Sequence, residues 1–161
     1  MSRKPLQNQL HRRHFLKTAV SAGAAVMAPT IIPSSALGRD GAVPPSERIV
    51  LGGIGIGNRG TYDLSCFLEQ KDVVFAAVCD VKESRRVAVK KTADNLYGNQ
   101  DCAMIRDFRE LLDRPDIDAV LIATGPNWHA TAAMHAARAG KDMYCEKPVT
   151  YNVHEAVELK N

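Results

Sequence analysis

Apolar and polar positions divide residues 48–161 into segments that alternate between two periodicities. Short runs rich in Val, Ile, Leu and Ala are typical of buried parallel strands, and they occupy residues 48–54, 73–79, 103–105, 119–124 and 142–145. Helical patterns lie at residues 61–70, 83–97, 107–112 and 129–139, and a last one starts near residue 152 and continues to the C-terminus. This alternation predicts right-handed crossovers, and therefore a doubly wound α/β fold (a Rossmann fold) whose parallel sheet is covered on both faces.

Local signals mark the ends of three of these helices. Asp107, followed by Glu110 three residues later, forms a variant of the capping box that begins helices. Gly140 stands where a glycine commonly ends a helix, and Asn152 with Glu155 is typical of a helix start. The alternating pattern is thus supported by the chemistry of the element boundaries.

The residues after the first predicted strand form the pattern G-x-G-x-x-G, and they read Gly55-Ile56-Gly57-Asn58-Arg59-Gly60. The pattern is weak alone, but between a strand and a helix it is typical of a loop that binds a dinucleotide. Gly55 permits a tight turn, Gly57 leaves room for a pyrophosphate at the helix N-terminus, and Gly60 allows close packing of helix on strand. The alternative is a glycine-rich turn that binds no ligand.

Asp80 closes the second predicted strand. A carboxylate at this position accepts hydrogen bonds from the adenosine ribose, and it would repel a 2′-phosphate, so NAD is expected in preference to NADP. Arg85 and Arg86 follow closely, and they could face a 2′-phosphate. A solvated helix face is the preferred interpretation of these two arginines.

Residues 1–38 are predicted to be an export signal. Arg12-Arg13-His14-Phe15-Leu16-Lys17 resembles the twin-arginine motif R-R-x-F-L-K. Residues 18–32 are modestly apolar and too short to span a bilayer, and the small residues up to Gly38 suit cleavage by a signal peptidase. We therefore expect twin-arginine export to the periplasm, followed by a linker at residues 39–47. The alternative is a disordered or amphipathic tail with a chance arginine pair.

The charge balance sets limits on the partners. The whole chain has a net charge of +3, but residues 1–38 hold five basic residues and no acidic ones, so the remainder carries 16 basic and 18 acidic residues. A net charge of −2 predicts no nucleic-acid partner and no membrane contact beyond export. The four cysteines lack metal-ligand spacing, so no metal is expected; they are typical of small buried hydrophobes, with a disulfide as the alternative.

Several segments together resemble the Gfo/Idh/MocA oxidoreductases. They are Asp107-Phe108-Arg109-Glu110-Leu111-Leu112, Asp116-Ile117-Asp118-Ala119-Val120, Ala123-Thr124 with His129 following, and Glu146-Lys147-Pro148. The resemblance covers residues 48–161, and Glu-Lys-Pro after a short fifth strand is its most diagnostic element. It implies an NAD(P)-dependent oxidoreductase, and it disfavours a methyltransferase with the same glycine loop.

The resemblance also implies a role for each matching position. The glycine loop and Asp80 would hold the ADP half, and Thr124 to His129, including Asn127, would line the nucleotide channel. Glu146 would lie near the nicotinamide ribose. Lys147 is the catalytic candidate, because it would point to the reacting carbon, either to orient the substrate or to take part in proton transfer. His129 has an alternative role as an ordinary residue at a helix start, and the proline after Thr124 stands one position later than is usual in the family.

Members of this family act on sugars, inositols and related polyols, and some use the cofactor transiently to cleave glycosides. They continue into a second α/β domain that walls the substrate pocket, so the expected organisation is a signal at residues 1–38, a linker at 39–47 and an NAD(P)-binding domain at 48–161 without that second domain. A truncated or non-catalytic NAD-binding module is the alternative function. A homo-oligomer remains an open possibility.

Overall fold

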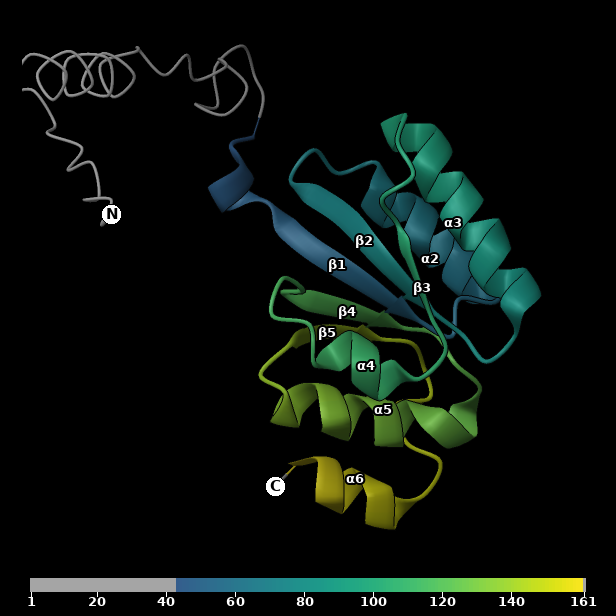
Figure 1. Cartoon of the computed structure of the whole chain (residues 1–161). Helices are drawn as coiled ribbons and strands as arrows, with labels where there is room; N and C mark the ends of the chain where they lie inside the picture. The colour runs from purple at the N-terminus through teal and green to yellow at the C-terminus, as the bar shows by residue number, and fades with distance from the viewer. Residues whose placement is uncertain (1–42, 161) are drawn as a thin grey trace, which may run out of the picture.

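The computed structural model describes residues 43–160 (Figure 1). The predicted export signal and the first part of the predicted linker lie outside the described residues. Five parallel strands form one sheet in the order β3-β2-β1-β4-β5, and their bounds are β1 (Ile49–Ile54), β2 (Val73–Cys79), β3 (Ala103–Ile105), β4 (Ala119–Ile122) and β5 (Asp142–Cys145). The helices are η3 (Pro45–Glu47), α2 (Asn58–Leu68), α3 (Glu83–Tyr97), α4 (Phe108–Leu112), α5 (Pro126–Arg138) and α6 (Val153–Lys160). The doubly wound α/β fold is confirmed.

Helices cover both faces of the sheet (Figure 1). One face packs on α2 and α3 through a buried cluster that includes Leu64, Phe75 and Val89. The other face packs on α4 and α5 through a cluster that includes Leu111 and Ala133. The helix α6 lies outside α5, against which it packs. Burial of apolar side chains on both faces explains why the strands read as nearly continuous apolar runs.

An irregularity in the pairing of β1 with β2 changes the face to which the β2 side chains point. The register shifts between Leu51 and Gly52, which pair with Phe75 and Ala77. Phe75 therefore packs against α2 and α3, while Ala77 and Cys79 lie in the cluster on the opposite face. The bulge thus delivers Cys79 to the α5 side of the sheet.

Two helices begin earlier than the sequence predicts. The helix α2 starts at Asn58 rather than at residue 61, because the turn at Gly57 already places the chain in the helical direction. The helix α5 starts at Pro126 rather than at His129, since a proline fits the first helical turn, where its missing N–H group is not needed. Consequently β4 ends at Ile122, two residues before the predicted end of that strand.

The predicted boundary signals are otherwise confirmed. The Asp107 side chain accepts a hydrogen bond of 2.9 Å from the Arg109 main-chain N–H at the start of α4. Gly140, with φ of +68°, ends α5. At the start of α6, Asn152 accepts a hydrogen bond of 2.9 Å from the Glu155 N–H.

All five strands end at the same edge of the sheet because they are parallel. The strand order runs outward from β1 in one direction through β2 and β3, and from β4 in the other direction through β5. The reversal between β1 and β4 is a topological switch point, the place where open α/β sheets bind ligands. None of the helices in residues 43–160 has the length and the apolar character that a membrane crossing requires.

Candidate functional site

The first and third glycines of the loop after β1 are required by the backbone and by packing. Gly55 has a φ of +71°, and a Cβ added there would lie 2.7 Å from the Thr124 Cα atom. A Cβ at Gly60 would lie 2.7 Å from the Ala123 Cβ. The turn role predicted for Gly55 and the packing role predicted for Gly60 are confirmed.

Gly57 differs from these two glycines because it faces a flexible side chain. A Cβ added there would meet only the Arg85 guanidinium, at 3.3 Å and beyond. Gly57 is the N-cap of α2, and no side chain caps this helix. The first N–H groups of α2 are therefore open to an anion, and the positive end of the helix dipole favours one.

The remaining residues of the loop lie in different surroundings. Ile56 is buried in the core between the sheet and α2, so only its main chain can contact a ligand. Asn58 and Arg59 occupy the first turn of α2 and are exposed. The cofactor contact expected of Ile56 would therefore be made by its main chain.

Asp80 follows β2 directly, and its side chain is buried, with 5% of the residue exposed. One carboxylate oxygen, Oδ1, accepts a hydrogen bond of 2.8 Å from the Lys82 main-chain N–H. The other, Oδ2, lies 3.5 Å from Nη1 of Arg85. Arg86 donates a hydrogen bond of 2.6 Å to the main-chain oxygen of Asp80. The carboxylate is therefore held in a fixed orientation.

The preferred interpretation of Arg85 and Arg86 as a solvated helix face holds only in part, because Arg85 is exposed but both arginines also contact Asp80. Both guanidinium groups turn back from α3 toward Asp80, and Arg85 lines the cavity described next. The physical reason is the attraction of the buried Asp80 carboxylate and carbonyl, which the sequence separation alone did not reveal.

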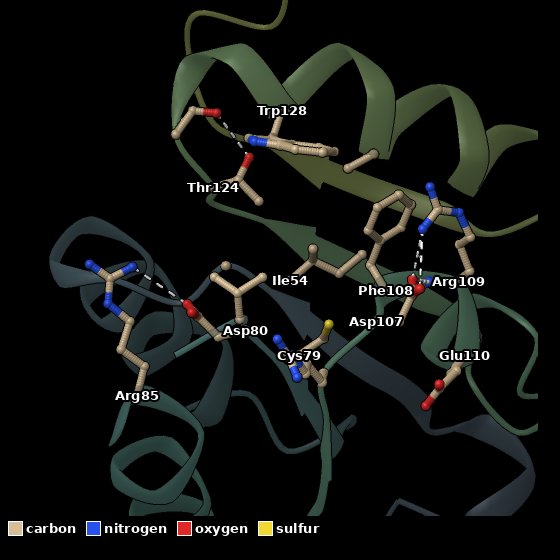
Figure 2. A pocket seen from close by; sticks show the side chains of 15 residues that line it. Ile54, Cys79, Asp80, Arg85, Asp107, Phe108, Arg109, Glu110, Thr124 and Trp128 are labelled. Carbon is tan, nitrogen blue, oxygen red and sulfur yellow. Dashed lines mark hydrogen bonds and ion pairs between the residues drawn. The ribbon is translucent and has the colours of Figure 1, made fainter. Parts of the chain in front are cut away.

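A cavity of about 450 Å³ lies at the switch point between β1 and β4 (Figure 2). Asp80 and Arg85 border one side, Phe108 and Arg109 border another, and Thr124 lies across from them with the ring of Trp128 beside it. The volume is within the range of small-molecule sites, and polar groups stand among apolar walls, as such sites require.

Residues of the segment after β3 contribute to this wall, and sequence reasoning did not assign them to the site. They include Arg106, Phe108 and Arg109. The signal that could have found them is their position, because residues that follow a parallel strand reach the ligand-binding edge of the sheet. Val81 and Cys79, at the end of β2, were missed in the same way.

Cys79 forms an apolar part of the cavity wall. Burial raises the pKa of its thiol to about 12, so the group is neutral at physiological pH. All four cysteines are free thiols, and Cys66 is exposed. Within residues 43–160, no group of three or more His, Cys, Asp or Glu side chains could hold a metal ion.

The residues after β4 that are expected to line the nucleotide channel lie in different environments. Thr124 lines the cavity, whereas Asn127 lies exposed in the first turn of α5 and is not part of the cavity wall. The early start of α5 at Pro126 places Asn127 in the first turn of that helix, and its contact with a nucleotide stays a prediction. Trp128, which is half-exposed, also forms part of the cavity wall.

His129 is a bridge between two turns. It is buried, with 2% exposed, its Nδ1 lies 2.7 Å from the Pro148 main-chain oxygen, and its Nε2 lies 3.0 Å from the Thr124 main-chain oxygen. Both ring nitrogens are occupied by protein groups, so the side chain is not free to contact a cofactor. It instead fixes the turn after β4 against the segment after β5.

Glu146 follows β5 directly, and its side chain is also engaged within the protein. Its Oε1 accepts a hydrogen bond of 2.9 Å from Arg59 Nε, and its Oε2 accepts one of 3.1 Å from the Lys147 main-chain N–H. The bond from Arg59 lowers the pKa of Glu146, so the carboxylate is ionised at neutral pH. Lys147 itself is exposed, and its side chain makes no hydrogen bond or ion pair within residues 43–160.

A glycine turn with an uncapped helix, an acid after β2 and a cavity at the switch point together define a dinucleotide-binding domain. The Gfo/Idh/MocA family model, described as an oxidoreductase family with an NAD-binding Rossmann fold, matches residues 49–161. This chain belongs to that family.

Three comparisons illustrate the likeness. The chain is 31% identical, over 94% of its length, to an alpha-N-acetylgalactosaminidase from Shewanella oneidensis. Its fold is similar to a structure described as a probable dehydrogenase from Thermotoga maritima, with a TM-score of 0.61 and 30% identity over 69% of this chain and 32% of the other. It has the same fold as a myo-inositol dehydrogenase from Lactobacillus casei in complex with NAD(H) and myo-inositol, with a TM-score of 0.62 and 22% identity over 70% of this chain and 32% of the other. The chain spans 36% of the length of the Shewanella relative.

Proposed function

We propose that residues 48–161 are the NAD(P)-binding domain of an exported oxidoreductase that acts on sugars, inositols or related polyols. The observation that carries this proposal is the cavity at the switch point, with the uncapped start of α2 and the fixed Asp80 carboxylate beside it. Family membership supports the nucleotide and the class of reaction. Residues 1–38 would be the signal and residues 39–47 the linker.

The residues present fit a dinucleotide. The main-chain N–H groups of Asn58 and Arg59 would meet the pyrophosphate, because no side chain caps α2 and none projects from Gly57. Asp80 would accept hydrogen bonds from the adenosine ribose. A bound nicotinamide dinucleotide supplies a hydride acceptor for the oxidation of a secondary alcohol.

Lys147 is proposed as the residue nearest to the reaction. Its ammonium group is exposed, while the turn that carries it is held by Glu146 through the main chain and by His129 through Pro148. A cation carried by a fixed turn at this edge of the sheet can orient a substrate hydroxyl or carbonyl oxygen by donating a hydrogen bond.

The relative affinity for NAD and NADP is expected to depend on Asp80 and Arg85. Asp80 favours NAD, since a 2′-phosphate would be repelled by its carboxylate. Arg85, whose guanidinium stands between Gly57 and Asp80, offers a counter-charge that would reduce this repulsion. We therefore expect NAD to bind more tightly, with measurable NADP binding.

Isothermal calorimetry on the chain tests the cofactor proposal. NAD is expected to bind, NADP to bind more weakly, and Arg85→Ala to weaken NADP binding more than NAD binding. Lys91→Ala, on an exposed position of α3, is the matched control and should change neither affinity. A folded chain that gives no heat with either nucleotide would contradict the proposal.

A second candidate activity is NAD-dependent glycoside cleavage, which the similarity to the Shewanella alpha-N-acetylgalactosaminidase favours. A third is an NAD-binding module without turnover. Incubating the chain and NAD with a panel of sugars and polyols, and separately with p-nitrophenyl α-N-acetylgalactosaminide, distinguishes these functions. NADH formation supports the dehydrogenase, release of p-nitrophenol supports the glycosidase, and nucleotide binding without either product supports the module.

The export proposal depends on the twin arginines of residues 12 and 13. Expressed in a bacterium, the chain is expected in the periplasm, and replacement of both arginines by lysine should retain it in the cytoplasm. Equal periplasmic amounts of the two forms would contradict this route.

A further inference from the structure

His129 is a buried polar residue in the first turns of α5, and the other buried residues of that helix are all alanines. These small side chains let the helix lie close to the sheet, which encloses the imidazole ring with 2% of the residue exposed. Its Nδ1 lies 2.7 Å from the Pro148 main-chain oxygen, and its Nε2 lies 3.0 Å from that of Thr124. Both partners are carbonyl oxygens, so a hydrogen bond made here is one that the ring donates.

The Thr124 end of this bridge belongs to the nucleotide side of the site. Thr124 lines the cavity, and its Cα packs so closely on Gly55 that an added Cβ there would lie 2.7 Å away. On its outer side the turn is open, because a Cβ added at Gly125 would meet nothing within 4 Å among the described residues. The turn after β4 is therefore fixed from within, by Gly55 and by the His129 ring.

The Pro148 end belongs to the side where the reaction is proposed to occur. The Lys147 side chain is exposed and makes no hydrogen bond or ion pair within residues 43–160, so its main chain decides where the ammonium group can reach. The Lys147 N–H is held by Glu146 Oε2 at 3.1 Å, and the carbonyl of the next residue is held by His129. Both chain neighbours of Lys147 are thus anchored by buried side chains.

We propose that His129 is a positioning residue for Lys147, and that its ring ties the placement of Lys147 to the turn that borders the nucleotide cavity. A planar ring with two side-chain torsions holds two carbonyl groups at a fixed separation with little loss of conformational entropy. The proposal rests on the proposed function, because that function gives Lys147 its role toward the substrate.

Two amide variants separate the two ends of the bridge. The amide nitrogen of asparagine lies about where Nδ1 lies in histidine, and the amide nitrogen of glutamine lies about where Nε2 lies. His129→Gln therefore keeps a donor for Thr124 and loses the one for Pro148, whereas His129→Asn keeps the donor for Pro148 and loses the one for Thr124.

Hydrogen exchange of the Lys147 main-chain N–H measures the Pro148 end. In His129→Gln, the exchange rate of Lys147 relative to that of Leu121, a buried residue of β4, should rise by about tenfold or more, because only the turn is released. His129→Asn should leave this ratio unchanged. A merely structural role would destabilise the whole domain and accelerate Leu121 at least as much as Lys147.

Calorimetry with ADP measures the Thr124 end, because ADP lacks the nicotinamide half that would lie beside Lys147. His129→Asn should bind ADP roughly tenfold more weakly than the unmodified chain, and His129→Gln should bind it with near-normal affinity. His154→Gln, at an exposed position of α6, is the matched control and should change neither measurement. Val89→Ala, buried on the opposite face of the sheet, controls for general destabilisation and should not raise the exchange ratio.

An unchanged exchange ratio in His129→Gln would overturn the positioning role, and an unchanged ADP affinity in His129→Asn would overturn the tie to the cavity. If both variants fail to fold, the unmodified chain decides: a Lys147 N–H that exchanges as fast as in an unfolded peptide would overturn the proposal, and a protected one supports it. If the folded chain binds no ADP, the proposed nucleotide site fails, while exchange at Lys147 still decides whether His129 holds the turn.

Discussion

The three glycines of the loop after β1 have different roles, although they belong to one motif. Gly55 and Gly60 are required for folding, because each is in contact with rigid parts of the segment after β4. A Cβ added at Gly57 would contact only the end of the Arg85 side chain. The absence of a side chain at Gly57 therefore keeps open the space at the N-terminus of α2. Glycine is therefore needed for stability at positions 55 and 60, and for ligand binding at position 57.

Substitution of these glycines by alanine should separate the two roles. Gly57→Ala is expected to change the free energy of unfolding by less than about 1 kcal/mol, since its φ of −93° suits alanine. NAD affinity should fall by roughly tenfold or more, because the methyl group occupies the approach of the pyrophosphate.

Gly60→Ala is the contrasting variant, and it should lower the free energy of unfolding by about 1–3 kcal/mol through the clash with Ala123. Urea unfolding and calorimetry with NAD measure the two quantities. Gly57→Ala with unchanged NAD affinity would count against a pyrophosphate at this turn.

At the scale of elements, short helices depend on their caps. The helix α4 has five residues and places Phe108 and Arg109 in the cavity wall. Its start is fixed by Asp107, whose carboxylate accepts hydrogen bonds from the main chain and the side chain of Arg109 (Figure 2). So short a helix is not stable alone, and its cap and its packing on the sheet maintain this part of the site.

Removal of the Asp107 cap should destabilise α4 in a pH-dependent way. The hydrogen bond from the Arg109 main chain is the main cause that lowers the pKa of Asp107. Its stabilisation is therefore fully present above the ordinary pKa of an aspartic acid, and it is lost as the pH falls through the lower folded value.

The thermal midpoint of Asp107→Ala should accordingly lie below that of the unmodified chain at pH 7, and the two midpoints should converge at strongly acidic pH. Asp107→Asn, which keeps a capping side chain, should show a smaller loss at pH 7. A difference between the midpoints that is independent of pH would show that the carboxylate charge is not involved.

Over the whole molecule, one side of the sheet is less covered than the rest. The strand β5 is at the edge of the sheet (Figure 1), and Tyr144 on it is half-exposed. Beyond it, Tyr151 and Val153 are 69% and 81% exposed. An open strand edge and exposed apolar side chains each favour association with another chain.

The chain is therefore expected to self-associate as its concentration rises. Light scattering after gel filtration should show a mass above 17.6 kDa at high concentration. The double substitution Tyr151→Ser with Val153→Lys should reduce this association, whereas Val87→Lys, at an exposed apolar position on α3, is the control and should not. A chain that stays monomeric at every concentration would contradict the prediction.

The sequence by itself determined the order and type of every strand and α-helix within the described residues, although it assigned the short helix η3 to a linker, and it located β2, α3 and β3 at the bounds that the structure shows. It also located the glycine turn and the acid after β2. These features depend on periodicity and on backbone conformation, which neighbouring residues specify locally.

Only the tertiary structure decided the partners of the site residues. Arg59 meets Glu146 across 87 positions of the chain, His129 joins two turns, and Arg85 reaches into the cavity. Such contacts depend on how helices and strands stack and on which buried charges must be neutralised, and no local pattern encodes either. The sequence therefore identified the edge of the sheet that carries the site, whereas the packing of the elements assigned each side chain its role there.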